Sequence, residues 1–314
     1  MEDYPKTLME FETRFSTEES CRQYLVQLRW PEGFRCPRCG GTKHWRLDDL
    51  YIQCADCHYQ ATVTAGTIFQ GTHLPLTVWF RAIWWVTSQK DGASALGMKR
   101  ILGCSYKTAW TLLHKLRRAM VRPGRDRLSG NVEVDETYLG GLEEGLRGRQ
   151  IEDKTLIVIA AQFEGNKIGR IRMNRVLDAS AASLQAFIKE SIEPGSVVYT
   201  DGWSGYTGLE NNGYDHKVIV LARSRKSPSD LLPRVHRIAS LLKRWLMGTH
   251  QGAISHEHLD YYLDEYVFRF NRRTSEYRGK LFYRLIQQAV QISPVTFSGI
   301  RQNVRGLRHG KYNR

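Results

Sequence analysis

Two aspartates stand at positions where an apolar strand tolerates a charge poorly. Asp135 lies inside the valine-rich run VEVDETY, and Asp201 ends the run VVYTDG. Burying a carboxylate among valines is costly unless a partner or a metal compensates its charge. Carboxylates that converge from several elements are the ligands that Mg²⁺ or Mn²⁺ need for phosphodiester chemistry. We therefore interpret Asp135 and Asp201 as metal ligands, with Glu133 as a secondary candidate on the same strand face; capping or turn roles are the alternative.

A third ligand is expected from a later helix that packs against the sheet. His236 lies in the basic segment VHRIASLLKRW, and Lys243 follows it by seven residues. Seven residues make about two turns and about 10.5 Å of rise, so the two side chains share nearly one face. One end of this stripe would hold metal, and the other, with Arg244, a DNA phosphate. An ordinary surface histidine is the alternative for His236.

Four of the six cysteines form two close pairs, Cys36 with Cys39 and Cys54 with Cys57. Each CxxC makes a tight knuckle, and two knuckles brought together by a hairpin complete a tetrahedral site. Four thiolates leave no open coordination position, so the sequence predicts a structural zinc rather than a catalytic one. Four free buried cysteines are the alternative.

The elements that must carry these residues follow from the hydrophobic pattern. After a linker, VRPGRDRLSGN, apolar and polar residues alternate, and the elements follow in the order β-β-β-α-β-α-β-α. That order is typical of an RNase H-like sheet, in which an antiparallel meander joins parallel strands. The strands that carry Asp135 and Asp201 would be neighbours in this sheet.

The pattern of residues 91–120 predicts a helix-turn-helix. Gly103 falls at the turn, and Ser105 is the expected N-cap of the second helix. Recognition helices meet base edges with their first turns. We expect DNA contacts from the side chains of Tyr106, Lys107 and Trp110, continued toward the phosphates by Lys115, Arg117 and Arg118. An ordinary helical hairpin with a solvated charged face is the alternative.

The charge balance points to a polyanionic partner. The 314 residues include 46 Lys and Arg against 32 Asp and Glu, a formal charge of +14, which suits nucleic acid. The excess of positive charge is concentrated in three segments, 77–130, 223–250 and 300–314. The longest apolar stretch is too short for a bilayer, and the acidic N-terminus does not resemble a signal peptide. We expect a cytoplasmic, nucleoid-associated protein without a membrane partner.

The expected fold is α/β, an RNase H-like mixed-sheet catalytic domain preceded by a four-cysteine zinc ribbon and a helical helix-turn-helix region. The expected parts are a helical lead-in at 1–30, the zinc ribbon at 31–72, the helix-turn-helix region at 73–122, the catalytic domain at 131–290 and a basic C-terminal tail at 291–314.

Over almost its full length the chain resembles the zinc-ribbon insertion-sequence transposases of the ISXO2-like group, a branch of the DDE superfamily. The matching segments include RCPRCGG, TAGTIFQGT, KDGASAL, SYKTAW, VEVDETYLGG, TDGWSGY, LPRVHR, LLKRWL and RGKLFYRL. The resemblance implies a catalytic tetrad at Asp135, Asp201, His236 and Lys243. Most members of the wider superfamily carry Glu where this chain has His236, and imidazole suits Mn²⁺ better than Mg²⁺.

These observations predict a transposase that binds the terminal inverted repeats of an insertion sequence. It would hydrolyse the phosphodiester at the element's ends and transfer the 3′-OH ends to target DNA with Mg²⁺ or Mn²⁺. Because two ends must be joined together, a homo-oligomer on double-stranded DNA is expected.

Two rival functions remain open at this point. One is a transcription regulator that kept the fold and lost the chemistry, which the intact tetrad disfavours. The other is an RNase H-like nuclease or junction resolvase without strand transfer. Two separate DNA-reading modules on one chain fit sequence-directed transposition better.

Overall fold

The computed structural model describes residues 2–48, 50–122, 124–140, 154–219, 231–251 and 254–302. The chain divides into two compact units, one from the described residues of Met1–Arg122 and Thr274–Arg314, the other from those of Pro123–Arg273. We describe each unit by itself. Among the described helices, none combines the length and apolar character that crossing a membrane requires.

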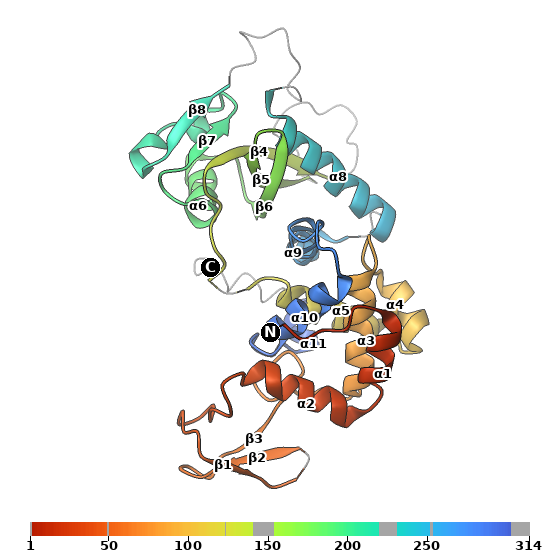
Figure 1. Ribbon diagram of the computed structural model, residues 1–314. Helices are drawn as coiled ribbons and strands as arrows, with labels where there is room; N and C mark the ends of the chain where they lie inside the picture. The colour runs from red at the N-terminus through yellow and green to blue at the C-terminus, as the bar shows by residue number, and fades with distance from the viewer. Residues whose placement is uncertain are drawn as a thin grey trace. The chain divides into compact units, whose positions relative to one another are not determined.

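The first unit begins with two short capped helices, α1 (Leu8–Arg14) and α2 (Glu18–Arg29) (Figure 1). The Thr7 hydroxyl accepts the backbone N–H of Glu10 at 3.1 Å, and Thr17 and Ser20 form a reciprocal capping box. Such caps satisfy N–H groups that the first helical turn leaves without intrahelical partners. The predicted helical lead-in is therefore a pair of helices.

A three-stranded antiparallel sheet follows, in the order β1-β2-β3. Its strands are β1 (His44–Arg46), β2 (Tyr51–Cys54) and β3 (Gln60–Thr62). Phe34, Ile52 and Ala61 form a small buried cluster together with two of the paired cysteines. A core of this size needs a further constraint to be stable, and a bound metal is a common one.

The helical part of the first unit consists of α3 (Leu76–Ser88), α4 (Ala95–Leu102), α5 (Tyr106–Ala119), α10 (Arg278–Ala289) and α11 (Phe297–Arg301). Phe282 of α10 lies 5.3 Å from Phe11 and 5.8 Å from Phe80, measured between ring centroids. The expected catalytic domain extended to residue 290, whereas α10 packs in the aromatic core of the first unit.

The second unit has a five-stranded mixed sheet in the order β6-β5-β4-β7-β8. The strands are β4 (Asn131–Leu139), β5 (Thr155–Glu164), β6 (Lys167–Val176), β7 (Val197–Thr200) and β8 (Asp215–Val218). β4 pairs antiparallel with β5 and parallel with β7, and β7 pairs parallel with β8. The predicted meander joined to parallel strands is confirmed, with β4 at the centre.

Helices cover both faces of this sheet, α6 (Ala181–Ser191) on one and α8 (Pro233–His250) on the other (Figure 1). The turns η1 (Ser204–Tyr206), η2 (Glu210–Asn212) and η4 (His256–His258) and the helix α9 (Leu259–Phe270) complete the unit. Ser180 caps α6 as predicted, accepting the N–H of Ser183 at 3.3 Å.

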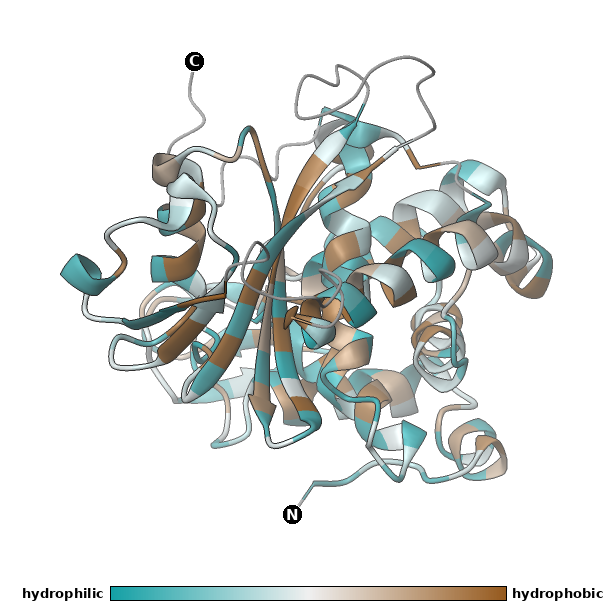
Figure 2. Ribbon diagram, turned by 90° about the horizontal axis from the view of Figure 1, so that it is seen from above, coloured by the Kyte–Doolittle hydropathy of each residue, from teal (hydrophilic) through white to brown (hydrophobic). Residues whose placement is uncertain are grey.

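Alternation along β4 decides which residues face which helix, and Figure 2 shows hydrophobic and hydrophilic colours alternating along the strands. Val132 and Val134 are buried in one core cluster with Leu184 and Phe187 of α6. Side chains alternate between the two faces of a strand. Asp135 therefore belongs to the opposite face, which α8 covers.

Candidate active site and zinc site

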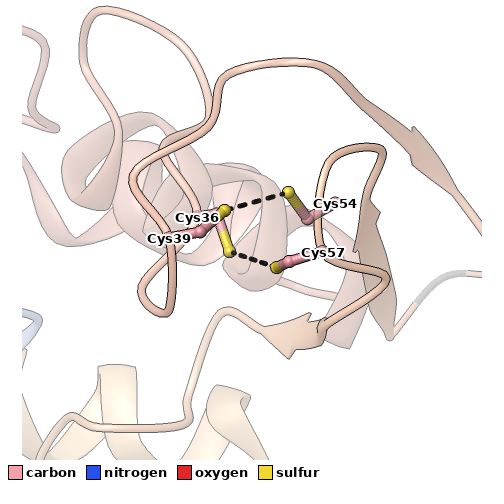
Figure 3. Close-up of side chains that lie close together, drawn as sticks. All are labelled: Cys36, Cys39, Cys54 and Cys57. Atoms are coloured by element: carbon pink, nitrogen blue, oxygen red, sulfur yellow. Dashed lines mark hydrogen bonds between the residues drawn. The ribbon is translucent and has the colours of Figure 1, made fainter.

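The four paired cysteines converge on one point (Figure 3). Their sulfur atoms all lie within 4.8 Å of one another. The Sγ atoms of Cys36 and Cys57, and those of Cys39 and Cys54, are 3.6 Å apart. Sulfurs in a tetrahedral zinc site, each about 2.3 Å from the ion, are separated by about 3.8 Å. The four predicted donors are thus brought together in one cluster that supports a structural zinc.

Local backbone geometry explains why glycines follow the first knuckle. Gly40 has a φ of +78°, a conformation in which a side chain is strained. A Cβ on Gly41 would lie 2.0 Å from the carboxylate Oδ2 of Asp56, so this exposed side chain would have to shift. The backbone conformation at Gly40 is therefore the stronger reason for a glycine after the first knuckle.

The environment of Cys36 favours the form that binds metal. Desolvation raises the pKa of its thiol, but hydrogen bonds from the backbone N–H groups of Cys39 and Arg38 outweigh it and lower that pKa to about 7. A thiolate binds zinc and a thiol does not.

In the second unit, Asp135 and His236 meet between the sheet and α8. The Nε2 atom of His236 lies 3.6 Å from the Oδ2 atom of Asp135, and their side chains are 35% and 18% exposed. This pair joins the central strand, β4, to α8, the helix that was expected to pack against the sheet. A carboxylate and an imidazole open to solvent can both donate electron pairs to one divalent ion.

Asp201 lies at the end of β7, beside the strand of Asp135. The parallel register runs from Asn131 opposite Val197 to Glu133 opposite Tyr199. Continued by two residues, the same register sets Asp135 level with Asp201. The carboxylate Oδ1 of Asp201 accepts the backbone N–H of Trp203 at 3.0 Å.

Tyr206 lies on the α6 side of the sheet, in the core cluster that contains Val132 and Val134. Its buried hydroxyl donates to Glu136 Oε2 at 2.7 Å. Burial raises the pKa of Tyr206 well above its usual range, and the adjacent Glu136 carboxylate raises it further. The charges of Asp135 and Asp201 act on the same hydroxyl in the same direction. This hydrogen bond was not predicted, and by the alternation along β4 Glu136 lies on the face opposite to Asp135.

In the described part of the chain, the paired cysteines are the group of three or more donors placed to hold one ion. Asp135, Asp201 and His236 do not form such a group in this structure. Their donor set of two carboxylates and an imidazole nevertheless fits a divalent cation.

Lys243 and Arg244 lie farther along α8, and both are exposed. Lys243 lines a cavity of about 540 Å³ within the second unit. The other lining residues are Tyr138, Leu139, Gly140, Leu246, Met247, Ile254, His256 and Leu259. The predicted stripe on α8 therefore begins at the Asp135–His236 pair and ends at an open cavity beside β4.

The secondary candidate, Glu133, has a different role from the one expected. It is 2% exposed, and its carboxylate forms an ion pair with the Arg234 guanidinium, Nη1 to Oε1, at 2.6 Å. It also accepts the backbone N–H groups of Arg234 and Val235. With both oxygens engaged, Glu133 is not a metal ligand in this structure. Sequence reasoning missed one signal: Glu133 precedes Asp135 by two residues on β4, and its partner Arg234 precedes His236 by two residues on α8.

The helix-turn-helix has the predicted turn. Gly103 is left-handed with a φ of +63°, and the Ser105 hydroxyl accepts the backbone N–H of Thr108 at 3.1 Å. Tyr106 is 51% exposed, and Lys107 is exposed with its ammonium 4.4 Å from the Phe297 ring centroid. Half-buried Trp110 stacks on His114, with ring centroids 3.9 Å apart.

Two residues expected on the phosphate-facing surface point inward instead. Arg117 is 2% exposed, and the Lys115 amine donates to the carbonyl oxygen of Ile68 at 3.3 Å. Burial lowers the pKa of Lys115. Arg117 therefore does not face DNA as predicted, because the inner face of α5 carries it. Lys115 and Arg118 are both half-buried.

Comparison with known families assigns both parts of the chain. Residues 127–271 match the ISXO2-like transposase domain, and residues 16–60 match the transposase zinc-ribbon domain. The first match contains both aspartates, His236 and Lys243, and the second contains all four paired cysteines. The chain therefore contains an ISXO2-like transposase domain and a transposase zinc ribbon, which define a DDE-type transposase and imply catalysis by divalent metal.

Similarity to individual proteins is weaker. A protein of Halobacterium salinarum, described as an uncharacterized protein in transposable element ISH50, is 27% identical over 281 residues, which are 81% of this chain and 91% of that protein. A chain of the simian T-cell lymphotropic virus intasome bound to PP2A regulatory subunit B56 gamma has a TM-score of 0.33 and 13% identity, over 60% of this chain and 70% of that one. A chain of the Mos1 mariner paired end complex with Mn has a TM-score of 0.28 and 15% identity, over 75% and 80%. TM-scores this low carry no weight for function.

Proposed function

We propose that this transposase binds the terminal inverted repeats of an insertion sequence, hydrolyses the phosphodiester at each end and transfers the resulting 3′-OH to target DNA. The observation that carries the proposal is the approach of His236 to Asp135 across β4 and α8. It brings two members of the expected tetrad together from distant segments of a matched transposase domain.

Asp135 and Asp201 would bind Mg²⁺ or Mn²⁺, with His236 as a third donor. When bound, such ions neutralise phosphate charge and activate the attacking oxygen, a water first and the 3′-OH afterwards. The imidazole of His236 favours Mn²⁺ over Mg²⁺, because nitrogen is a softer donor than a carboxylate oxygen. The Trp203 N–H would meanwhile restrain Asp201 through its Oδ1 atom.

Lys243 and Arg244 would hold the DNA near the cut. Lys243 is exposed on α8, seven residues and about 10.5 Å of rise beyond His236. That is a suitable distance for an ammonium to bind a phosphate next to the scissile one, where it neutralises charge without ligating metal.

Recognition of the element's ends would fall to the zinc ribbon and the helix-turn-helix. Tyr106 and Lys107 are exposed on the first turn of α5, the part of a recognition helix that meets base edges. Trp110 and Arg118 are half-buried and would contribute at the margin of that surface. The formal charge of +14 supplies attraction to phosphates independent of sequence.

Because two element ends must be joined to one target, we expect a homo-oligomer that assembles on double-stranded DNA, which would place the protein at the nucleoid. Incubating the purified protein with DNA that carries its flanking repeats and Mn²⁺, then mapping nicks and joined products, tests the proposal. Nicks at the repeat boundary with strand transfer are expected. Binding without nicks would indicate a regulator, and cleavage without joining a nuclease.

A further inference from the structure

We propose that Glu133 is a positioning residue of the active site, which holds the first turn of α8 so that His236 faces Asp135. The inference rests on the proposed function, because His236 matters only if it acts in the reaction. Glu133 lies outside the expected tetrad. We assign to its buried carboxylate the positioning of His236, the third member of that tetrad.

The first observation is how Glu133 caps α8. Its Oε2 atom accepts the backbone N–H of Arg234 at 2.8 Å and that of Val235 at 3.0 Å. The helix's own N-cap residue, Leu232, offers no side-chain hydrogen bond, and Pro233 follows it. The first N–H groups of a helix need acceptors from elsewhere. For α8, the central strand of the sheet provides them.

The second observation is a side-chain clamp on the same turn. The Nη1 atom of Arg234 donates to Glu133 Oε1 at 2.6 Å, and its Nη2 atom donates to the carbonyl oxygen of Gly165 at 2.6 Å. The guanidinium also lies 3.9 Å from the Phe163 ring centroid. Arg234 is therefore bound to β4 and to the β5–β6 turn at once, which restricts both rotation and translation of the helix start.

The spacing transmits this restraint to the catalytic pair. Glu133 and Asp135 are two residues apart on one face of β4, or about 6.8 Å. His236 directly follows Val235, whose N–H the carboxylate holds. A displacement of the first turn therefore displaces the imidazole relative to Asp135 by a similar amount, and small misplacements of reacting groups cost much rate.

Two substitutions distinguish a positioning role of Glu133 from a general contribution to the stability of the fold. Glu133→Gln removes the charge and sets an NH₂ group against donors, so the clamp fails while the volume is kept. The matched control is Glu265→Gln on α9, since Glu265 is 1% exposed and is held at 2.8 Å by Arg269 of the same helix, a pair that involves neither α8 nor β4. Both variants should unfold at lower denaturant concentration than the wild type.

Cleavage rates in two backgrounds give the first readout. Glu133→Gln should lower the rate about 10-fold in the wild type but less than about 2-fold when His236 is already Ala, since contacts in one network are not additive. Glu265→Gln should act equally in both backgrounds. Equal losses from Glu133→Gln in both backgrounds would overturn the proposal.

The second readout needs neither metal nor DNA. The ring Cε1–H resonance of His236, identified by its loss in His236→Ala, should shift in Glu133→Gln and not in Glu265→Gln. Glu133→Asp, which shortens the side chain by about 1.5 Å, and Arg234→Lys serve the same purpose if Glu133→Gln does not fold. An unshifted resonance in the folded variants rejects the positioning role. If the wild type fails to cleave DNA but the resonance shifts, the proposed function fails and the positioning role stands.

Discussion

The imidazole of His236 on α8 and the carboxylate of Asp135 on β4 face each other at 3.6 Å in the second unit of this transposase. The two residues come from segments that the sequence keeps far apart, and the helix start that carries His236 is bound to the strand that carries Asp135. Replacing the imidazole by a different metal-binding side chain therefore tests the role of His236.

Replacing His236 by Glu should keep end cleavage and shift its metal preference. The carboxylate is a harder donor, so the ratio of rates in Mg²⁺ and Mn²⁺ should rise severalfold toward Mg²⁺. His236→Ala removes the donor and should lower the rate by at least about 10-fold in both metals. The measurement is the rate of end cleavage by each variant in Mg²⁺ and in Mn²⁺. A His236→Ala variant as active as the wild type in both metals would contradict the ligand role.

Lys243→Ala should weaken binding of end DNA and leave metal affinity unchanged, because a protonated lysine is no ligand. The slope of log K against log salt should fall by about 1 when one phosphate contact is lost. Lys243→Arg keeps the charge and should be milder, although the larger guanidinium fits the phosphate differently.

Lys217→Ala is the matched control for Lys243→Ala, since Lys217 is an exposed lysine of β8 that pairs with Asp215. Salt-dependent binding titrations should show no change in slope for this control. The same slope for Lys243→Ala and the wild type would remove Lys243 from the DNA contact.

Cys39→Ser should abolish zinc binding and spare the fold of the second unit. One of the four converging sulfurs is lost, so bound zinc measured by elemental analysis should fall from one per chain toward zero. Cys104 lies outside the cluster, and Cys104→Ser should keep its zinc. A zinc-free wild type would refute the site.

Tyr206→Phe should lower the free energy of unfolding by about 1–3 kcal/mol, since it removes a donor from the Glu136 carboxylate. Tyr214→Phe is the control: Tyr214 lies in the same core cluster, and its hydroxyl donates to the carbonyl oxygen of Ile192 at 3.1 Å. Bonds to a charged acceptor are worth more than bonds to a neutral one. Denaturant unfolding monitored by fluorescence should therefore show the larger loss for Tyr206→Phe.

Local patterns predicted much of this molecule. Alternation around Asp135 predicted the strand that carries it, Gly103 and Ser105 marked the turn and N-cap between α4 and α5, and the cysteine spacing predicted the cluster of four sulfurs. In each case the signal is carried by residues close in sequence.

The failures share a physical cause, namely contacts between distant segments. Charge alone placed Arg117 on the surface, although burial is decided by what packs against α5. The place of α10 depends on the Phe282 contacts with Phe11 and Phe80. Glu133 resembled a metal ligand because its bonds to Arg234 cannot be read from its own strand.

The most direct test of the proposed chemistry is the rate at which Asp135→Ala and Asp201→Ala variants cleave DNA that carries the element's ends. Each change removes a carboxylate from the metal site and leaves the ribbon and the helix-turn-helix intact. Cleavage should fall by more than about 100-fold, beyond the 10–100-fold that loss of an outer partner costs, while end binding persists. The exposed Asp215 of β8 serves as control, and Asp215→Ala should cleave normally. Near-normal cleavage by Asp135→Ala or Asp201→Ala would contradict the assignment of these carboxylates to the active site.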